Sequence, residues 1–171
     1  MAFSINNFRE NLTVGKTNLF EVDFVFPGGI SPSLVDTENL TLKCFSAEIP
    51  GVNLNTFEQT DYGLPRNIAY GKLYAESSFG LILSEDYKEL KDFNRWINFI
   101  YDDFTGNVKY LFNYATTTTL RVYDPQGRIR TTVNFDESYP KTITPIQLSW
   151  EDTDSLPRAT VTMAYRKYFL F

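Results

Sequence analysis

The sequence contains no histidine and a single cysteine, Cys44, among its 171 residues. Histidine is the commonest general base, the usual partner of a nucleophilic serine or cysteine, and the commonest metal ligand. A single cysteine can neither form an internal disulfide nor build a zinc site. These absences argue against an enzyme, and they fit a protein that is made and kept in a reducing cytoplasm.

Long apolar runs and an excess of positive charge are also missing. The longest apolar runs, such as FGLIL, have about five residues, whereas a membrane span needs about 18 or more. The start, MAFSINNFRENL, has no charged segment followed by an apolar core, so we expect neither secretion nor membrane anchoring. The chain has 16 Lys plus Arg against 21 Asp plus Glu, a formal net charge of -5. That charge has the wrong sign for binding a phosphate backbone.

Two short patterns imitate functional motifs without completing them. Gly15, Lys16 and Thr17 copy the end of a phosphate-binding loop, but Glu10 stands where that loop needs its first glycine. The acidic stretch EDTD lacks the glycine turn and the distal glutamate of a calcium loop and is typical of a solvated turn. No obvious pair of carboxylates is framed by apolar residues. We therefore predict no catalytic residue, no metal ion and no cofactor.

What the sequence has in abundance is aromatic residues and strand patterns. Aromatic residues make up 16% of the chain, with 15 Phe and 11 Tyr, which is more than one small core needs. Period-two alternation predicts several strands, and the turn DPQG joins two of them as a hairpin. The predicted strands are Leu19–Phe26, Leu40–Ile49, Thr116–Tyr123, Arg128–Phe135, Thr144–Trp150 and Arg158–Tyr165.

One segment has helical periodicity. From Ser84 onward, apolar residues recur at steps of three and four, and Ser84 is the expected N-cap of a helix of about 18 residues that ends near Gly106. Its apolar stripe consists of Leu90, Phe93, Ile97 and Ile100.

Two segments do not fit a compact domain. Residues Phe57–Tyr74 contain Gly and Pro and read as a long excursion, which in compact domains is usually functional or disordered. The chain ends on Tyr168, Phe169, Leu170 and Phe171, where most domains carry polar residues. Because the alternation stops after Tyr165, we expect this end to dock on a neighbouring subunit. The alternative is that it folds back on its own domain.

Five stretches, in this order and spacing, resemble the tail tube proteins of T-even-type contractile-tailed bacteriophages (myoviruses). They cover nearly the whole chain, although none is a catalytic fingerprint. The stretches are TNLFEVDF, CFSAEIPGVN, RNIAYGK, LILSEDYKELKDFNRWINFI and PIQLSWEDTDSLPRATVTMAYRKY.

The resemblance implies a mainly β fold, a β-sandwich or barrel with one flanking α-helix, in a single tail-tube domain over residues 1–171. It also implies that hexameric rings stack into a hollow conduit that delivers the genome into the host. Implied partners are the tail sheath protein, the baseplate tube-initiator and the tail terminator, while DNA passes through the lumen without specific binding. The expected location is the virion tail, after assembly in the host cytoplasm. Tube subunits of type VI secretion and related contractile injection systems, and baseplate tube-initiator proteins, share the fold and stay as alternatives.

We expect the lumen to be lined by polar and acidic strand faces because the net charge is negative. Loops at strand ends should form the contacts between rings, because a ring presents them along its axis. The predicted inter-subunit contacts are Pro50, Gly51, Tyr62, Gly63, Leu64, Arg66, Tyr168, Phe169, Leu170 and Phe171.

A function of another class is a β-sandwich carbohydrate-binding module. Such a module needs exposed coplanar aromatic side chains, but both tryptophans, Trp96 and Trp150, fall on predicted core elements. Binding of a monomer to a glycan array would favour this alternative.

Overall fold

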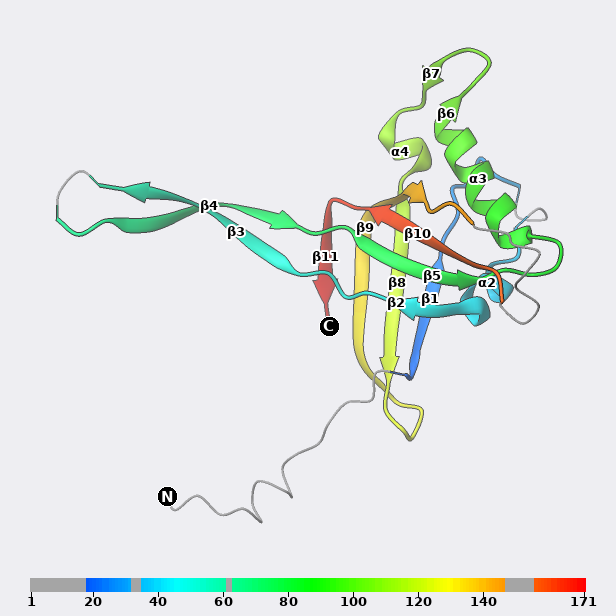
Figure 1. Cartoon of the computed structure of the whole chain (residues 1–171), viewed down its shortest axis with the longest axis horizontal. Helices are drawn as coiled ribbons and strands as arrows, with labels where there is room; N and C mark the ends of the chain where they lie inside the picture. Colours follow the sequence, from blue (N-terminus) through cyan, green and yellow to red (C-terminus); the bar gives the residue numbers. More distant parts are fainter. Residues whose placement is uncertain (1–17, 32–34, 61–62, 147–155) are drawn as a thin grey trace.

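The computed structural model describes residues 18–31, 35–60, 63–146 and 156–171, which form two packed layers of antiparallel strands (Figure 1). In what we call the β8 sheet, β8 pairs with β1 and with the first half of β9, and β9 also pairs with β11. In the β5 sheet, the second half of β9 pairs with β10, which is followed by β5 and β2. The strands are β1 (Phe20–Phe24), β2 (Cys44–Ala47), β5 (Ser77–Ile82), β8 (Thr116–Tyr123), β9 (Ile129–Ile143), β10 (Arg158–Ala164) and β11 (Lys167–Leu170).

Strand β9 links the two layers, since its 15 residues belong to both sheets. The strands of the β5 sheet run across those of the β8 sheet in Figure 1, so the molecule is a sandwich and not a closed barrel. Glu137, with a φ of 54°, lies where β9 passes from one sheet to the other. The mainly β fold predicted from the sequence is confirmed.

The predicted hairpin around DPQG is present. Strands β8 and β9 pair from Val122↔Thr131 onward, and Gly127 donates its N–H to the Asp124 carbonyl at 3.0 Å. The Asp124 carboxylate accepts the N–H groups of Gln126 at 2.8 Å and Arg128 at 3.0 Å, and it forms an ion pair with Arg130. These bonds hold the turn in place, and Gly127 supplies its positive φ of 76°.

The strand predicted over Leu40–Ile49 is wrong in its first half. Residues Thr37–Lys43 form the short helix α2, and β2 begins only at Cys44. Asp36 caps this helix by accepting the N–H of Asn39 at 3.3 Å, a side-chain bond that competes with strand formation. The alternation of Leu40 and Leu42 is misleading, because Leu40 is buried while Leu42 is 83% exposed.

The predicted helix exists but begins later and is shorter. Helix α3 spans Lys88–Ile100, with Tyr87 and not Ser84 as its N-cap. Its buried face consists of Glu89, Asp92, Phe93 and Trp96, so the stripe is rotated from the predicted one. Trp96 is fully buried and donates its indole N–H to the Tyr114 carbonyl at 3.0 Å.

A short hairpin and a single helical turn follow α3, in the place where the sequence predicted the end of the helix. They are β6 (Tyr101–Asp102), β7 (Asn107–Val108) and α4 (Leu111–Tyr114). Among the described residues, α3 is the longest helix, and no described helix has the length and apolarity to cross a membrane.

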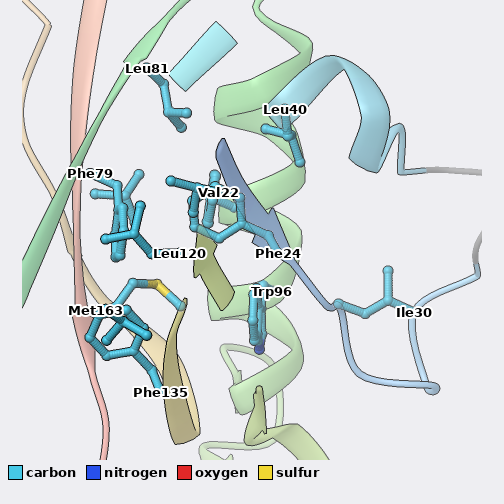
Figure 2. Packing of buried hydrophobic residues seen from close by; sticks show 13 residues of the cluster. Val22, Phe24, Ile30, Leu40, Phe79, Leu81, Trp96, Leu120, Phe135 and Met163 are labelled. Carbon is cyan, nitrogen blue, oxygen red and sulfur yellow. The ribbon is translucent and has the colours of Figure 1, made fainter. Parts of the chain in front are cut away.

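The core lies between the two sheets and is closed on one side by α3 (Figure 2). Phe24 of β1 contacts the rings of Phe79 and Phe93, each at 5.4 Å between centroids and close to perpendicular. Phe79 in turn meets Phe135 of β9 at 5.9 Å. Such edge-to-face pairs add to the free energy of burial, so this aromatic chain connects both sheets and the helix.

A buried ionic cluster fixes the start of α3. The Glu89 side chain is only 2% exposed and forms an ion pair with Lys43 at 2.5 Å. It also accepts the Ser84 N–H at 2.9 Å and the Ser84 hydroxyl. Burial raises the pKa of Glu89, but the bonds from Lys43 and Ser84 outweigh it and lower the pKa from 4.5 to about 2. Ser84 is therefore occupied as a partner of Glu89, which explains why it does not cap the helix.

We predict an acid-induced loss of stability that depends on Glu89. Because its folded pKa lies below its unfolded value, the stabilisation is complete above pH 4.5 and disappears as the pH falls towards 2. The shift is equivalent to about 3 kcal/mol. Glu89→Gln should therefore lower the Tm at pH 7 and flatten the decline of Tm between pH 5 and 2, measured by circular dichroism.

Asp92 provides a contrast, because burial raises its pKa against the opposing charge of Arg95. The Asp92→Asn variant should therefore keep the decline of Tm in acid that Glu89→Gln loses. Equal acid limbs in wild type and Glu89→Gln would contradict our explanation of the cluster.

Candidate interaction surfaces

The excursion predicted from Phe57 to Tyr74 is a long two-stranded arm. Strands β3 (Val52–Gln59) and β4 (Arg66–Tyr74) pair with each other from Val52↔Tyr74 to Gln59↔Arg66, with a bulge at Tyr70 of β4, opposite Asn55 and Thr56. Figure 1 shows the arm projecting from the side of the sandwich, away from the core. Eight residues of strand span about 26 Å, so the tip lies far from the body. The sequence contained the arm's polar–apolar alternation, but the bulge interrupts it.

The arm carries large apolar side chains along its length. Val52 is the cross-strand partner of Tyr74 and Phe57 is that of Ile68; these four residues, with Leu54 and Tyr70, are what we call the apolar arm face. Leu54 is 63% and Tyr70 is 68% exposed, and the rings of Phe57 and Tyr70 contact each other at 6.2 Å. The other residues of the arm are mainly polar or small, and Lys72 is the cross-strand partner of Leu54.

Only the root of the apolar arm face is covered by the described part of the same chain. Tyr74 meets the ring of Tyr168 at 5.4 Å and that of Tyr165 at 6.3 Å. The Tyr165 hydroxyl donates to the Ala75 carbonyl, and burial raises its pKa to about 12, so it stays protonated. A two-stranded hairpin without a second layer is marginally stable in water, so the remainder of this face is suited to contact another chain.

The predicted contact residues are divided between the two ends of the arm. Pro50 is buried at the root and Gly51 beside it is exposed. At the tip, Gly63 has a φ of 85° and Leu64 is 91% exposed, and Arg66 begins β4. Tyr62 lies outside the described residues. The structure thus places the two predicted segments at opposite ends of the same arm.

The C-terminal residues form a strand of their own sheet. Strand β11 pairs with β9 from Lys167↔Asp136 to Leu170↔Val133, and Phe171 and Thr132 exchange two backbone bonds of 2.9 and 3.0 Å. Tyr168 packs against Phe135 of the core. This attachment was the alternative in the sequence analysis; the alternation stops because the chain turns at Arg166 and changes sheets.

Docking of this end on a neighbour stays a prediction, now restricted to its exposed side chains. Phe169, Leu170 and Phe171 are 44, 62 and 73% exposed, and the rings of Phe169 and Phe171 contact each other at 6.2 Å. Strand β11 also has an outer edge that no described strand occupies.

The chemically reactive groups of the described residues have structural partners. Glu89 and Asp92, a pair of buried carboxylates that the sequence analysis missed, are bound to Lys43 and Arg95. Burial raises the pKa of Cys44 to about 12, which leaves its thiol a poor nucleophile at neutral pH. Within the described ranges, no group of three or more His, Cys, Asp or Glu side chains is placed to hold a metal ion.

The sequence profile of the phage tail tube protein family matches residues 15–170. The chain belongs to this family. No curated protein sequence matches the chain significantly. The family is structural, and it supports a tube subunit function for this chain.

Solved structures share the fold of this tail tube protein at low identity. A chain of the sheath-tube complex of an extracellular contractile injection system (PVC) in the extended state has 14% identity and a TM-score of 0.67, with 99% of both chains covered. A chain of the anti-feeding prophage tube-terminating cap has 13% identity and a TM-score of 0.68, covering 100% of this chain and 94% of the other. A chain of the anti-feeding prophage baseplate has 10% identity and a TM-score of 0.69, covering 93% and 96%.

Proposed function

We propose that this tail tube protein assembles as hexameric rings that stack into the inner tube of a contractile phage tail, and that this tube conducts the genome into the host. Residues 1–171 act as one tube domain, with no catalytic activity and no cofactor. The arm carries the proposal, because its apolar face has partners only at its root within the described chain.

The sheet edges support assembly of identical subunits. Among the described residues, no strand pairs with the outer edge of β2, or with the second half of β9 on the side opposite β10. Free edges of this kind pair with other strands unless they are covered. If the β2 edge of one subunit pairs with the β9 edge of the next, neither edge is left exposed. Repeating this head-to-tail contact around an axis forms a closed ring when the rotation per subunit divides a full turn.

The proposed tube has an outer surface and two ends, and each of these contacts a different partner. The tail sheath is the partner of the outer surface of the tube, while the baseplate tube-initiator and the tail terminator contact its two ends. The solved neighbours come from sheath-tube, cap and baseplate assemblies, which supports this set of partners. Assembly in the host cytoplasm and a final place in the virion tail belong to the same proposal.

Electron microscopy of the purified protein tests the function directly. We expect six-fold rings or hollow filaments, formed without metal or cofactor and promoted by high protein concentration or by a baseplate template. A strictly monomeric species under all of these conditions would contradict the proposal.

Shortening the arm should abolish stacking and leave the fold intact. In the test variant, Thr56 is joined to Ala69 by an Asn-Gly turn, which preserves the cross-strand pair at that point. We expect an unchanged Tm, because the removed residues have no part in the core, and loss of filaments in sedimentation and microscopy.

Single substitutions on the arm give a matched control for this variant. Tyr70→Ser, on the apolar arm face, should raise the protein concentration needed for filaments at least about tenfold, equivalent to ~1.4 kcal/mol of lost contact. Asn67→Ser, which removes no apolar side chain, should change it little. Filaments of normal length from the shortened arm would mean that another surface joins the rings.

The exposed C-terminal aromatic side chains should contribute to assembly separately from the stability of the subunit. The double variant Phe169→Ser and Phe171→Ser removes two side chains that lie outside the core, so it should reduce the polymer fraction while lowering Tm only slightly. Tyr168→Ser should instead lower Tm, because Tyr168 packs on Phe135. A large Tm decrease in the double variant, with normal polymerisation, would assign these residues to the subunit's own stability.

A further inference from the structure

The outer face of the β5 sheet, which points away from the core, carries mainly small hydroxyl side chains, and the ring of Phe45 lies over Gly80 on this face. Thr162 of β10 stands beside Thr142 of β9 and Ser78 of β5, and the hydroxyls of Ser78 and Thr162 are 3.5 Å apart. One row further, Thr160 stands beside Gly80. The Thr144 hydroxyl donates to the Thr160 carbonyl at 3.1 Å and accepts the Thr160 N–H at 2.9 Å. We call this surface the hydroxyl face, and it consists of Ser46, Ser78, Gly80, Thr142, Thr144, Thr160, Thr162 and Ala164.

Charged groups are confined to the borders of the hydroxyl face. Glu48 follows β2, Glu76 precedes β5, and Arg158 is the first residue of β10, 5.0 Å from the ring of Phe45. Lys141 lies at the bulge of the outer strand β9 and forms an ion pair with Glu76. These two acids and two bases cancel, so within the described residues the middle of the face is uncharged.

The outer face of the β8 sheet is different. Charged residues occupy its strands and pair across them, with Arg121 at 3.5 Å from both Glu21 and Asp23. A further pair joins Lys167 and Asp136 at 3.8 Å. The molecule therefore presents one charged sheet face and one neutral sheet face, although 22% of its residues are charged.

The inner wall of a conduit for DNA should neither bind nor strongly repel phosphate groups. Cations on the inner wall would hold phosphates through salt-sensitive ion pairs, and a dense layer of carboxylates would repel them over about a Debye length, ~8 to 10 Å. Short hydroxyl side chains do neither, and they hold water at the wall while leaving space in the lumen. No described strand pairs with either outer edge of the β5 sheet, so the sheet can continue from subunit to subunit as an unbroken wall.

We infer that the hydroxyl face lines the lumen and forms a neutral wall along which the polyanionic nucleic acid passes. The inference rests on the proposed tube function and adds to it the identity of the inner surface. It replaces the acidic lumen expected from the net charge with one that is polar but uncharged, and it places the charged β8 sheet towards the outside of the tube.

Cysteine labelling of assembled tubes tests this assignment. Thr162→Cys and Thr119→Cys each place one thiol in the middle of a sheet, on the hydroxyl face and on the charged face, and both positions are half-buried. The wild-type chain is the control for Cys44, whose pKa of about 12 keeps its thiol protonated. Each protein is treated, before and after assembly, with N-ethylmaleimide and with a maleimide carrying a polyethylene glycol chain too bulky to enter the tube.

In tubes, we expect Thr162→Cys to react with N-ethylmaleimide and to lose at least about tenfold of its reactivity towards the bulky reagent, while Thr119→Cys keeps its reactivity towards both. In unassembled subunits, both positions should react with both reagents. The reverse pattern, or equal behaviour of the two positions in tubes, would overturn the assignment and leave the tube function standing. If wild type and variants form no rings or tubes, the proposed function fails and the inference fails with it.

Discussion

The exposed apolar surface of the arm formed by β3 and β4 is the constraint on which assembly depends. The apolar arm face rests on the same chain only at Tyr74, where Tyr165 and Tyr168 meet it, and the remainder is exposed in the described chain. Burying large apolar side chains is worth roughly 1.5 to 3 kcal/mol each, so an isolated subunit forgoes several such contributions. The subunit is therefore a complete fold with an exposed apolar surface, and in the proposed tube a second copy covers that surface.

The sandwich explains how this surface can exist without destabilising the subunit. Strand β9 belongs to both sheets, and the aromatic chain through Phe24, Phe79 and Phe135 holds those sheets together independently of the arm. The cluster of Glu89, Lys43 and Ser84 then attaches α3 to α2 and to the end of β5. Because these interactions lie within one chain, edges and arm stay free for assembly.

Much of the fold could be predicted because local chemistry and tertiary packing agree there, as in β1 and in the hairpin closed by Asp124 and Gly127. Prediction failed where a polar side chain outside the recognised pattern decided the outcome. Ser84 looked like a helix cap but binds Glu89, and the alternation of Leu40 and Leu42 looked like a strand but lies in a helix capped by Asp36. The arm was missed for a further reason: the extra residue Tyr70 in β4, opposite Asn55 and Thr56, shifts the alternation of that strand by one residue. The hydroxyl face could not be recognised because its threonines and serines come from four strands far apart in the sequence.

The most direct measurement of the central claim is amide hydrogen exchange of the arm in the unassembled subunit and in tubes. The amides of β3 and β4 that are far from Tyr74 should exchange rapidly in the subunit, because the two strands have no second layer. In tubes, our account predicts that their exchange slows by orders of magnitude, while the core strand β8 is protected in both states. Equal exchange of the arm in subunit and tube would contradict the claim that a second copy covers it.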